Sequence, residues 1–158
     1  MTRPVVHQFL LLAALVTSAW LAGLYYAFSC SVLPGLGRTA DGTFVAAVTS
    51  INAAIRNPLF ALSFAGGPVL TAGAVPAALA AGRAGAAGAA AAALALHAGA
   101  LAVTVTRNLP LNDALDAAAD GPCPARTGFE RPWRRWNAVR AVLATGAVTG
   151  LGAGLVAA

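Results

Sequence analysis

The stretch FLLLAALVTSAWLAGLYYAFSCSVL, residues 9–33, contains no charged side chain. Residues 58–82, 84–106 and 138–158 are three further apolar stretches of comparable length. A helix that crosses the hydrocarbon core of a bilayer needs about 20 mostly apolar residues, and its internal hydrogen bonds satisfy the backbone groups that lipid cannot. The sequence therefore predicts an all-α membrane protein, a bundle of four transmembrane helices at these four stretches.

The composition excludes an ordinary soluble protein. Of the 158 residues, 59% are hydrophobic and 9% are charged, whereas a soluble domain carries about 25% charged residues. We therefore expect one membrane domain over residues 1–158, with membrane lipids as its first partners. The net charge of +5 comes entirely from arginine, because the chain has no lysine. Nucleic-acid binding needs a solvated basic face, and these arginines stand beside apolar spans, so we expect no nucleic-acid partner.

The N-terminus has the outline of a signal peptide. Arg3 precedes the apolar core FLLLAALV, and Thr17-Ser18-Ala19 has the small residues of a cleavage site. The apolar run nevertheless continues to Leu33 without a polar break, and this length suits a membrane span. We therefore predict an uncleaved first transmembrane helix.

The arginines divide unequally between the two sides of this bundle. The side of the termini and of the turn at 82–85 carries Arg3 and Arg83, whereas the loops 34–57 and 107–137, with the start of the fourth span, carry the other eight. By the positive-inside rule, both long loops are cytoplasmic and the termini lie outside a cell membrane. Arginines that serve a binding site would weaken this inference.

Both long loops are predicted to contain short amphipathic helices. In DGTFVAAVTSINAAIR, residues 41–56, apolar side chains recur at helical spacing, and Asp41 is placed to cap the helix. Asn57 and Pro58 then suit the cap and the first turn of the second span. After the third span, Pro110 suits the start of a helix LNDALDAAAD, and GPCPARTG predicts a break before the fourth span.

Prolines and glycines within the spans predict where helices bend and where they pack closely. Pro68 and Pro76 predict a kink or local unwinding of the second span. The fourth span contains two overlapping GxxxG steps, at Gly146, Gly150 and Gly154. Such steps permit close approach of two backbones, either inside the four-helix unit, which is the simpler interpretation, or across a homodimer.

Metal and disulfide chemistry have little support in the sequence. Cys30 and Cys123 have no metal-ligand spacing; both fall on the same membrane side, which leaves a disulfide open, but two free thiols are the simpler prediction. His97 is an ionisable side chain deep within a span, which makes it a functional candidate. A neutral histidine bonded to a neighbouring carbonyl explains it equally well. No second histidine or carboxylate lies at ligand spacing from it, so we expect no metal.

Many polar side chains gather at one depth, at the loop-side ends of the second, third and fourth spans. This polar ring comprises Asn52, Arg56, Asn57, Arg107, Asn108, Asn112, Asp113, Trp133, Trp136, Asn137 and Arg140. The last four share one helical face by their spacing. Arg140 falls in the first turn of a span, where an unpaired guanidinium is costly, so we expect Asp113 or an asparagine carbonyl as its acceptor.

Two interpretations of the polar ring stay open. Taken singly, its asparagines suit helix caps, its tryptophans suit interfacial anchors, and its arginines suit side chains that extend to the lipid headgroups. Taken jointly, so many amides, guanidinium groups and indoles at one depth predict a binding or catalytic pocket.

Four motifs connect the chain to a known family. They are GLYYAFSCSVLPGL, FVAAVTSINAAIRNPLF, TVTRNLPLNDAL and PWRRWNAVR. Over nearly its whole length, the chain resembles the integral-membrane family that includes the fungal anthrone oxygenases, with the motifs in the same order and spacing. The Asn-x-Pro-Leu-Asn and Trp-x-x-Trp-Asn-x-x-Arg patterns are the most specific of them.

The resemblance implies oxidation of an anthrone to an anthraquinone by O₂ without a dedicated cofactor. Such a reaction needs a base for the methylene proton, cations or amides that stabilise an oxyanion, and aromatic walls for a flat ring. On the matching motifs, the resemblance implies Asp113 as the base and Arg107, Arg140 and Arg56 as charge stabilisers. It implies substrate contacts from Asn52, Asn57, Asn108, Asn112, Asn137, Trp133 and Trp136.

A rival hypothesis keeps the fold and discards the enzyme. The chain would then be a four-helix membrane module that binds a lipid, a quinone or a partner protein, and the polar ring would be structural. Anthrone turnover by folded variants of the ring separates the two hypotheses.

Overall fold

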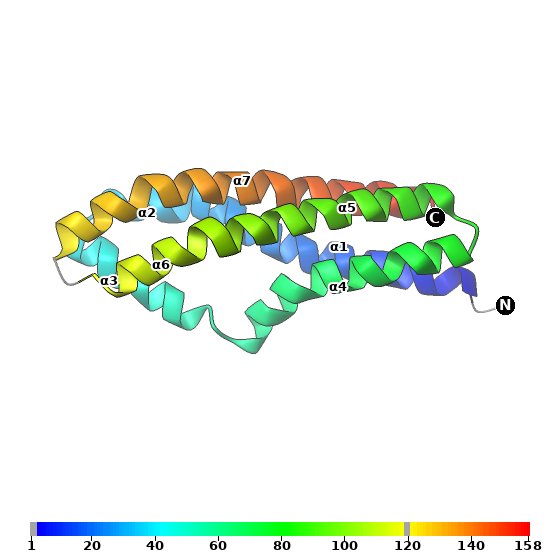
Figure 1. Ribbon diagram of the computed structural model, residues 1–158, viewed down its shortest axis with the longest axis horizontal. Coiled ribbons are helices and arrows are strands. Elements are labelled where there is room, and N and C mark those ends of the chain that lie inside the picture. Colours follow the sequence, from blue (N-terminus) through cyan, green and yellow to red (C-terminus); the bar gives the residue numbers. More distant parts are fainter. Residues whose placement is uncertain (1–2, 119–120) are drawn as a thin grey trace.

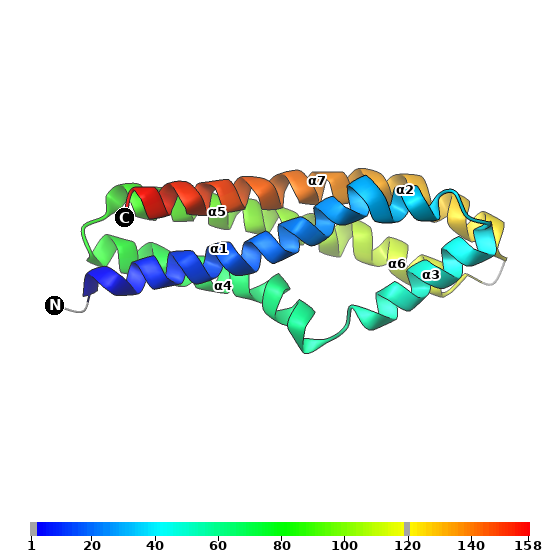
Figure 2. The same cartoon turned by 180° about the vertical axis from the view of Figure 1, so that it is seen from behind.

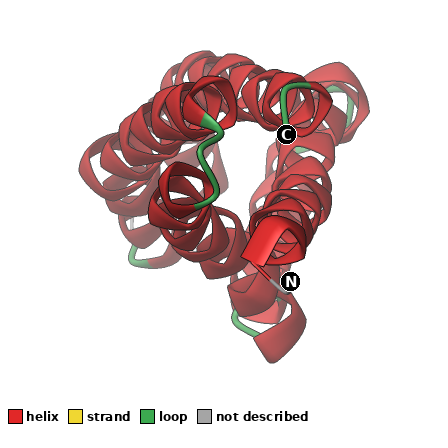
Figure 3. Cartoon of the chain, turned by 90° about the vertical axis from the view of Figure 1, so that its right-hand side faces the viewer, coloured by secondary structure: helices red, strands yellow, loops and turns green. Residues whose placement is uncertain are grey.

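The computed structural model describes residues 3–118 and 121–158, which form helices along one long axis (Figure 1). The long helices are α1 (Arg3–Ala27), α4 (Pro58–Ala80), α5 (Ala84–Val103) and α7 (Pro122–Val156). α1 packs against α4, α4 against α5, α5 against α7 and α7 against α1, so the four form a closed ring when seen from the end (Figure 3). Each lies in a helical segment long and apolar enough to cross a membrane. The predicted four-helix membrane fold is confirmed.

Two spans continue beyond their predicted ends through a turn of π-helix. α1 runs through η1 (Phe28–Val32) into α2 (Leu33–Leu36), and α5 runs through η2 (Thr104–Asn108) into α6 (Leu109–Asp116). In both places a Leu-Pro pair follows the π turn directly. Proline has no N–H to donate and its ring crowds the carbonyl four residues earlier, and the wider π turn accommodates it. The third span and the helix that follows it are therefore one continuous rod.

The predicted break before the fourth span is wrong. α7 begins at Pro122, directly after Gly121, whose φ of 96° turns the chain into the helix. A proline suits the first helical position because its missing N–H has no partner there. With 35 residues α7 is about 52 Å long, whereas the hydrocarbon core measures about 30 Å. About 22 Å of α7 therefore extends beyond the thickness of the apolar layer.

Local features of α3 (Asp41–Ala54) and α4 were partly predicted. Asn57 does cap α4, because its side chain accepts a hydrogen bond from the Phe60 backbone N–H at 2.9 Å. Asp41 does not cap α3: its side chain makes no capping bond and binds Arg126 instead. The second span is not unwound, since α4 is helical throughout despite Pro68 and Pro76.

The core of the bundle consists largely of alanine. Its buried cluster comprises Leu11, Ala14, Ala74, Ala78, Ala86, Ala87, Ala90, Ala93, Ala147 and Leu151. Larger side chains such as Phe9, Trp20 and Val142 are exposed on the outside. Inside a bilayer the hydrophobic effect does not hold helices together, and small residues let backbones approach closely enough for dispersion forces to do so.

The glycines of the fourth span take part in this packing. A Cβ atom at Gly150 would lie 3.5 Å from the Ala89 carbonyl oxygen and 3.5 Å from the Ala93 Cβ of α5. Gly154 faces the same helix, and Gly146 contacts Leu96. Packing inside the four-helix unit therefore accounts for all three, and a homodimer through them stays a prediction.

A second core lies at the end of the bundle where the long loops fold. The cap, as we name it, consists of α2, α3, α6 and the first half of α7 (122–137). Its buried side chains are Leu33, Phe44, Val48, Leu115, Phe129 and Trp133. The junction of α3 with α4 projects from the body of the molecule near the middle of its long axis in both side views (Figures 1 and 2).

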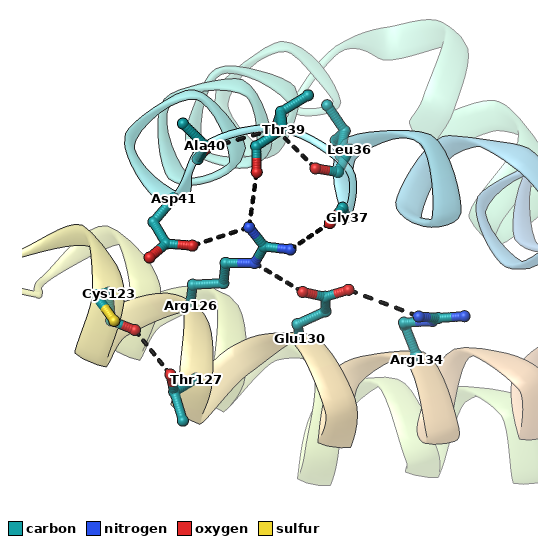
Figure 4. Close-up of polar contacts among 10 residues, drawn as sticks. All are labelled: Leu36, Gly37, Thr39, Ala40, Asp41, Cys123, Arg126, Thr127, Glu130 and Arg134. Atoms are coloured by element: carbon teal, nitrogen blue, oxygen red, sulfur yellow. Dashed lines mark hydrogen bonds and ion pairs between the residues drawn. The ribbon is translucent and has the colours of Figure 1, made fainter.

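Arg126 joins α7 to the segment that connects α2 with α3. Its guanidinium donates to the Asp41 carboxylate at 2.9 Å, to the Thr39 carbonyl at 2.9 Å, and to the Gly37 carbonyl at 2.7 Å. Its Nε donates to Glu130 at 2.8 Å (Figure 4). Cys123, one helical turn earlier, is exposed, and like Cys30 it is a free thiol, as the simpler interpretation predicted.

Replacing Arg126 with glutamine is expected to loosen α3, because a neutral amide cannot replace the four oriented donors of the guanidinium. Hydrogen exchange followed by mass spectrometry would show faster exchange over residues 41–54, with the bundle unchanged. Arg131→Gln, a matched change on the exposed face of the same helix, is expected to leave that exchange as in the wild type. Equal exchange in both variants would contradict the role of Arg126.

Candidate functional site

A cavity of about 240 Å³ lies where the cap meets the bundle. We name it the site cavity. Much of its wall is apolar, and includes Phe28, Ile51 and Phe60. Its polar lining residues are Asn52, Arg56, Thr104, Asn112, Asp113, Asp116, Asn137 and Arg140, with Tyr25 and Trp133 as amphipathic rings. An apolar pocket with a few convergent polar groups is the usual form of a small-molecule site.

Arg140 is the buried cation of this cavity, with 7% of its surface exposed. Its guanidinium carbon lies 4.3 Å from the centre of the Tyr25 ring and 5.2 Å from that of Trp133. Nη2 donates to the Asn137 side-chain oxygen at 2.8 Å, and Nη1 lies 3.5 Å from the Thr104 hydroxyl. The acceptor is thus an asparagine, and no ion pair to Asp113 or any other carboxylate forms among the described residues.

Asn137 holds Arg140 in place from the same helix. Its Nδ2 donates to the Tyr25 backbone carbonyl at 2.8 Å and to the Ser29 hydroxyl at 2.8 Å, so its carbonyl oxygen is turned toward the guanidinium. Ser29 lies in the π turn η1, and Thr104 is the first residue of the π turn η2. The two π turns therefore place polar groups of the first and third spans beside the fourth.

Trp133 forms a fixed aromatic wall. Its indole N–H donates to the Asn112 side-chain oxygen at 2.8 Å, which ties α7 to α6. Its ring centre lies 5.6 Å from that of Phe28. The one donor of the indole, its N–H, is satisfied, and the ring, held between neighbouring side chains, lines the site cavity.

Replacing Asn112 with leucine is expected to lower the free energy of unfolding by about 1–3 kcal/mol, because the half-enclosed indole N–H loses its acceptor. Denaturant unfolding in detergent, followed by circular dichroism, measures the change. Asn112→Asp retains an acceptor oxygen and is expected to keep most of the stability. A leucine variant as stable as the wild type would show that the contact contributes nothing.

The mouth of the site cavity is formed by α3 and α6. The Asn52 amide donates to the Asp116 carboxylate at 3.3 Å and joins the two helices. Arg56 lies just beyond the end of α3, outside the helix although the sequence predicted helix as far as residue 56, and is exposed. Asp113 is also exposed and forms neither a hydrogen bond nor an ion pair in the part of the chain that the structure describes.

Four members of the polar ring do not line the site cavity. Arg107 stacks on the Trp136 ring at 5.0 Å, away from the lining. Asn57 caps α4. Asn108 is buried, with 1% of its surface exposed, and neither polar atom of its amide group has a hydrogen-bond partner within the described part of the chain. The interpretation of the ring asparagines as helix caps therefore holds for Asn57. The lining of the site cavity brings together the other members of the ring: Asn52, Arg56, Asn112, Asp113, Trp133, Asn137 and Arg140.

The sequence-based prediction missed the contribution of the first span. Tyr25, Phe28 and Ser29 stand beside Arg140, Trp133 and Asn137 respectively. The motif GLYYAFSCSVLPGL contains all three, but no site residue was taken from it. The four-residue spacing of Tyr25 and Ser29 was the available signal, because it places both on one face of a helix.

His97 lies outside the site cavity, deeper in the bundle. Its Nε2 is 3.2 Å from the Ser18 hydroxyl of α1. The partner of this nitrogen is thus a side-chain hydroxyl and not the carbonyl of the simpler interpretation. Within the described residues, no group of histidine, cysteine and carboxylate side chains gathers as metal ligands would.

The comparison with known proteins adds the family. The family model described as "Anthrone oxygenase" matches residues 58–150, which is more than half of the chain. The match extends from the start of α4 to residue 150, near the C-terminal end of α7, and includes Asn112, Asp113, Trp133, Asn137 and Arg140. No curated protein and no solved structure matches the chain. With its fold, its site cavity and this match, the chain belongs to the anthrone oxygenase family.

Proposed function

We propose that the protein oxidises the methylene group of an anthrone-like aromatic polyketide to the carbonyl of a quinone, with O₂ as oxidant, in the site cavity. The observation that carries the proposal is Arg140, a buried cation without a carboxylate partner among the described residues, held between aromatic rings at the wall of an apolar cavity. Family membership supports the class of reaction. The volume of about 240 Å³ lies slightly below the lower end, roughly 300 Å³, of the range for small-molecule pockets, which suits a compact, flat molecule.

The proposed chemistry needs charge stabilisation more than covalent catalysis. A base removes one methylene proton, and the resulting enolate carries its negative charge on the oxygen that faces Arg140. One electron passes from the enolate to O₂, and the carbon radical and superoxide combine to a peroxide. The outer oxygen takes up a proton, and loss of water leaves the new carbonyl. One anthrone and one O₂ thus give one anthraquinone and one water.

Each lining residue has a place in this scheme. Asp113 at the mouth is the proposed base, since it lines the cavity and none of the described residues pairs with its carboxylate. Arg56 adds positive charge there, and Asn52 orients the substrate while it bridges to Asp116. Trp133 and Tyr25 are the walls for the rings, and Asn137 positions Arg140. Arg107 and Trp136 brace α7 from outside the cavity.

We place the mouth of the site cavity at the cytoplasmic face of the cell membrane. Eight of the ten arginines lie in the cap, its loops or the start of the fourth span, and the positive-inside rule puts such segments in the cytoplasm.

The test is turnover by the purified protein in lipid nanodiscs. A hydroxylated anthrone is supplied in air, and quinone absorbance and O₂ consumption are followed together against protein-free autoxidation. One O₂ consumed for each quinone, at a rate proportional to protein, supports the proposal. Saturable binding of the anthrone without acceleration of its oxidation supports the rival, a non-enzymatic binding module.

Asp113→Asn is expected to lower kcat by about 100-fold or more, the usual effect of removing a general base. The amide has nearly the same shape, and the exposed position tolerates it, so the fold is retained. Asp116→Asn serves as the matched change on the same helix and is expected to lower kcat less, because Asp116 accepts from Asn52. The assignment of the base fails if Asp116→Asn is the more damaging variant.

A further inference from the structure

A second pocket of about 310 Å³ lies deeper in the bundle, among α1, α4, α5 and α7. We name it the inner pocket. Most of its lining is apolar, and Leu21, Pro68 and Ala144 are examples. His97 and Ser18 are its buried polar side chains, and the His97 Nε2 lies 3.2 Å from the Ser18 oxygen. The inner pocket therefore presents one hydrogen-bonding point in an apolar surrounding.

The rim of the inner pocket belongs to the outer surface of the spans. Val69 of α4 is 67% exposed and Leu101 of α5 is 45% exposed, and both line the pocket. Large apolar side chains exposed at this depth of a membrane bundle face lipid. The inner pocket thus opens to the bilayer between α4 and α5.

Gly67 of α4 makes room for the polar pair. A Cβ atom at this position would lie 2.6 Å from the Ser18 oxygen and 3.4 Å from the His97 Cε1. Any side chain at position 67 would displace Ser18 and His97 or fill the space next to them. The backbone of α4 therefore passes the pair closely and leaves the histidine edge facing the pocket.

The inner pocket and the site cavity share a wall. Tyr25 and Phe64 line both spaces. The Tyr25 ring also lies 4.3 Å from the Arg140 guanidinium carbon. Phe64 stacks on Phe60 of the site cavity with ring centres 5.6 Å apart. Tyr25 and Phe64 therefore stand between the two spaces as common lining.

We propose that the inner pocket is a binding site for a lipid-dissolved, flat polycyclic phenol or ketone, and that it is the entrance by which such a substrate reaches Arg140 from the bilayer. The proposal takes its substrate class from the proposed function. An apolar ring system of this kind partitions into lipid and enters between α4 and α5. Its oxygen binds at the His97–Ser18 pair, and the rings then pass Tyr25 and Phe64 into the site cavity.

Photolabelling tests the binding site without requiring turnover. Benzophenone, an aromatic ketone that inserts into nearby C–H bonds on irradiation, is added to the full-length protein in phosphatidylcholine nanodiscs, and labelled peptides are identified by mass spectrometry. Saturable labelling within 64–69 and 97–101 is expected. His97→Leu is expected to lower its efficiency about fivefold, the factor for one ordinary hydrogen bond. If His97→Leu does not fold, Ser18→Ala provides the same test, because it removes the hydroxyl but keeps the packing.

A rim variant tests the entrance. Ala65→Trp places an indole at the exposed edge of the inner pocket and is expected to abolish labelling there. It is also expected to raise the KM for an anthrone delivered in the nanodiscs about tenfold at unchanged kcat. Ala72→Trp, on an exposed position of the same helix outside the lining, is expected to change neither quantity.

The outcomes separate this inference from the proposed function. Labelling that is unsaturable, or equal in wild type and Ala65→Trp, overturns the inner pocket as a binding site even where anthrone turnover is found. An unchanged KM in Ala65→Trp overturns the entrance. Saturable labelling without any anthrone turnover leaves the binding site standing and removes the oxygenase.

Discussion

Arg140→Gln is expected to lower kcat for anthrone oxidation by about 100-fold or more, the loss that follows removal of one preorganised donor from an oxyanion site. The enolate forms in an apolar cavity, where a fixed positive charge is worth far more than in water. Glutamine can still donate a hydrogen bond to Asn137, so the polar contact between α7 and its neighbours is partly kept. The rate of quinone formation in nanodiscs, measured at saturating anthrone, reports the effect.

Two further variants make this result interpretable. Arg140→Lys keeps the charge but loses the planar fork that lies against Tyr25 and Trp133, so we expect it to recover only part of kcat. Arg131→Gln removes an exposed arginine of the same helix and is expected to keep full activity. A folded Arg140→Gln protein that turns over as fast as the wild type would rule out the oxyanion role. The polar ring would then be structural, as the rival hypothesis holds.

Gly150→Leu is expected to destabilise the protein by about 3 kcal/mol or more, at the upper end for an overpacked core. The position faces the Ala89 carbonyl oxygen and the Ala93 Cβ at 3.5 Å. These atoms belong to the helix α5 itself and cannot rotate away, so the added side chain must separate α7 from α5. Because α7 carries Trp133, Asn137 and Arg140, activity should fall together with stability.

The control for this variant is Gly88→Leu on α5. No atom beyond its own helix lies within 4 Å of a Cβ built at Gly88, and leucine is the better helix former. We expect it to be at least as stable as the wild type in thermal unfolding followed by size-exclusion chromatography. Similar stability for Gly150→Leu and Gly88→Leu would show that the α5–α7 contact does not depend on a small residue.

The fold was largely predictable because its causes are local. Apolar runs of spanning length predict helices in any bilayer protein, and Asn57-Pro58 predicts the start of α4 from the chemistry of a cap and a first turn. The errors have local causes as well. A Leu-Pro pair after a π turn continues a helix that the proline was expected to restart, and Pro122 begins α7 within a segment that resembled a break.

The sequence predicted how far along the bundle axis the residues of the candidate site lie, but not which way their side chains point. Position along the chain fixes how far from the membrane face each member of the polar ring lies, since a helix rises about 1.5 Å per residue. Which way each side chain points depends on the rotation of its helix. Because α6 continues α5 as one rod, Arg107 falls beside Trp136 on the outside, while Asn112 reaches the Trp133 indole.

The sequence by itself determined four membrane helices, a polar ring at one depth and an arginine at the start of the last span. These follow from hydrophobicity and backbone hydrogen bonding, which depend on neighbours along the chain. Only the tertiary structure decided that Asn137 rather than Asp113 accepts from Arg140, and that Tyr25 lies over the guanidinium. Asn137 and Tyr25 are 112 residues apart and meet only where α7 packs against α1. Such partners are set by the mutual rotation of packed helices, which no local pattern encodes.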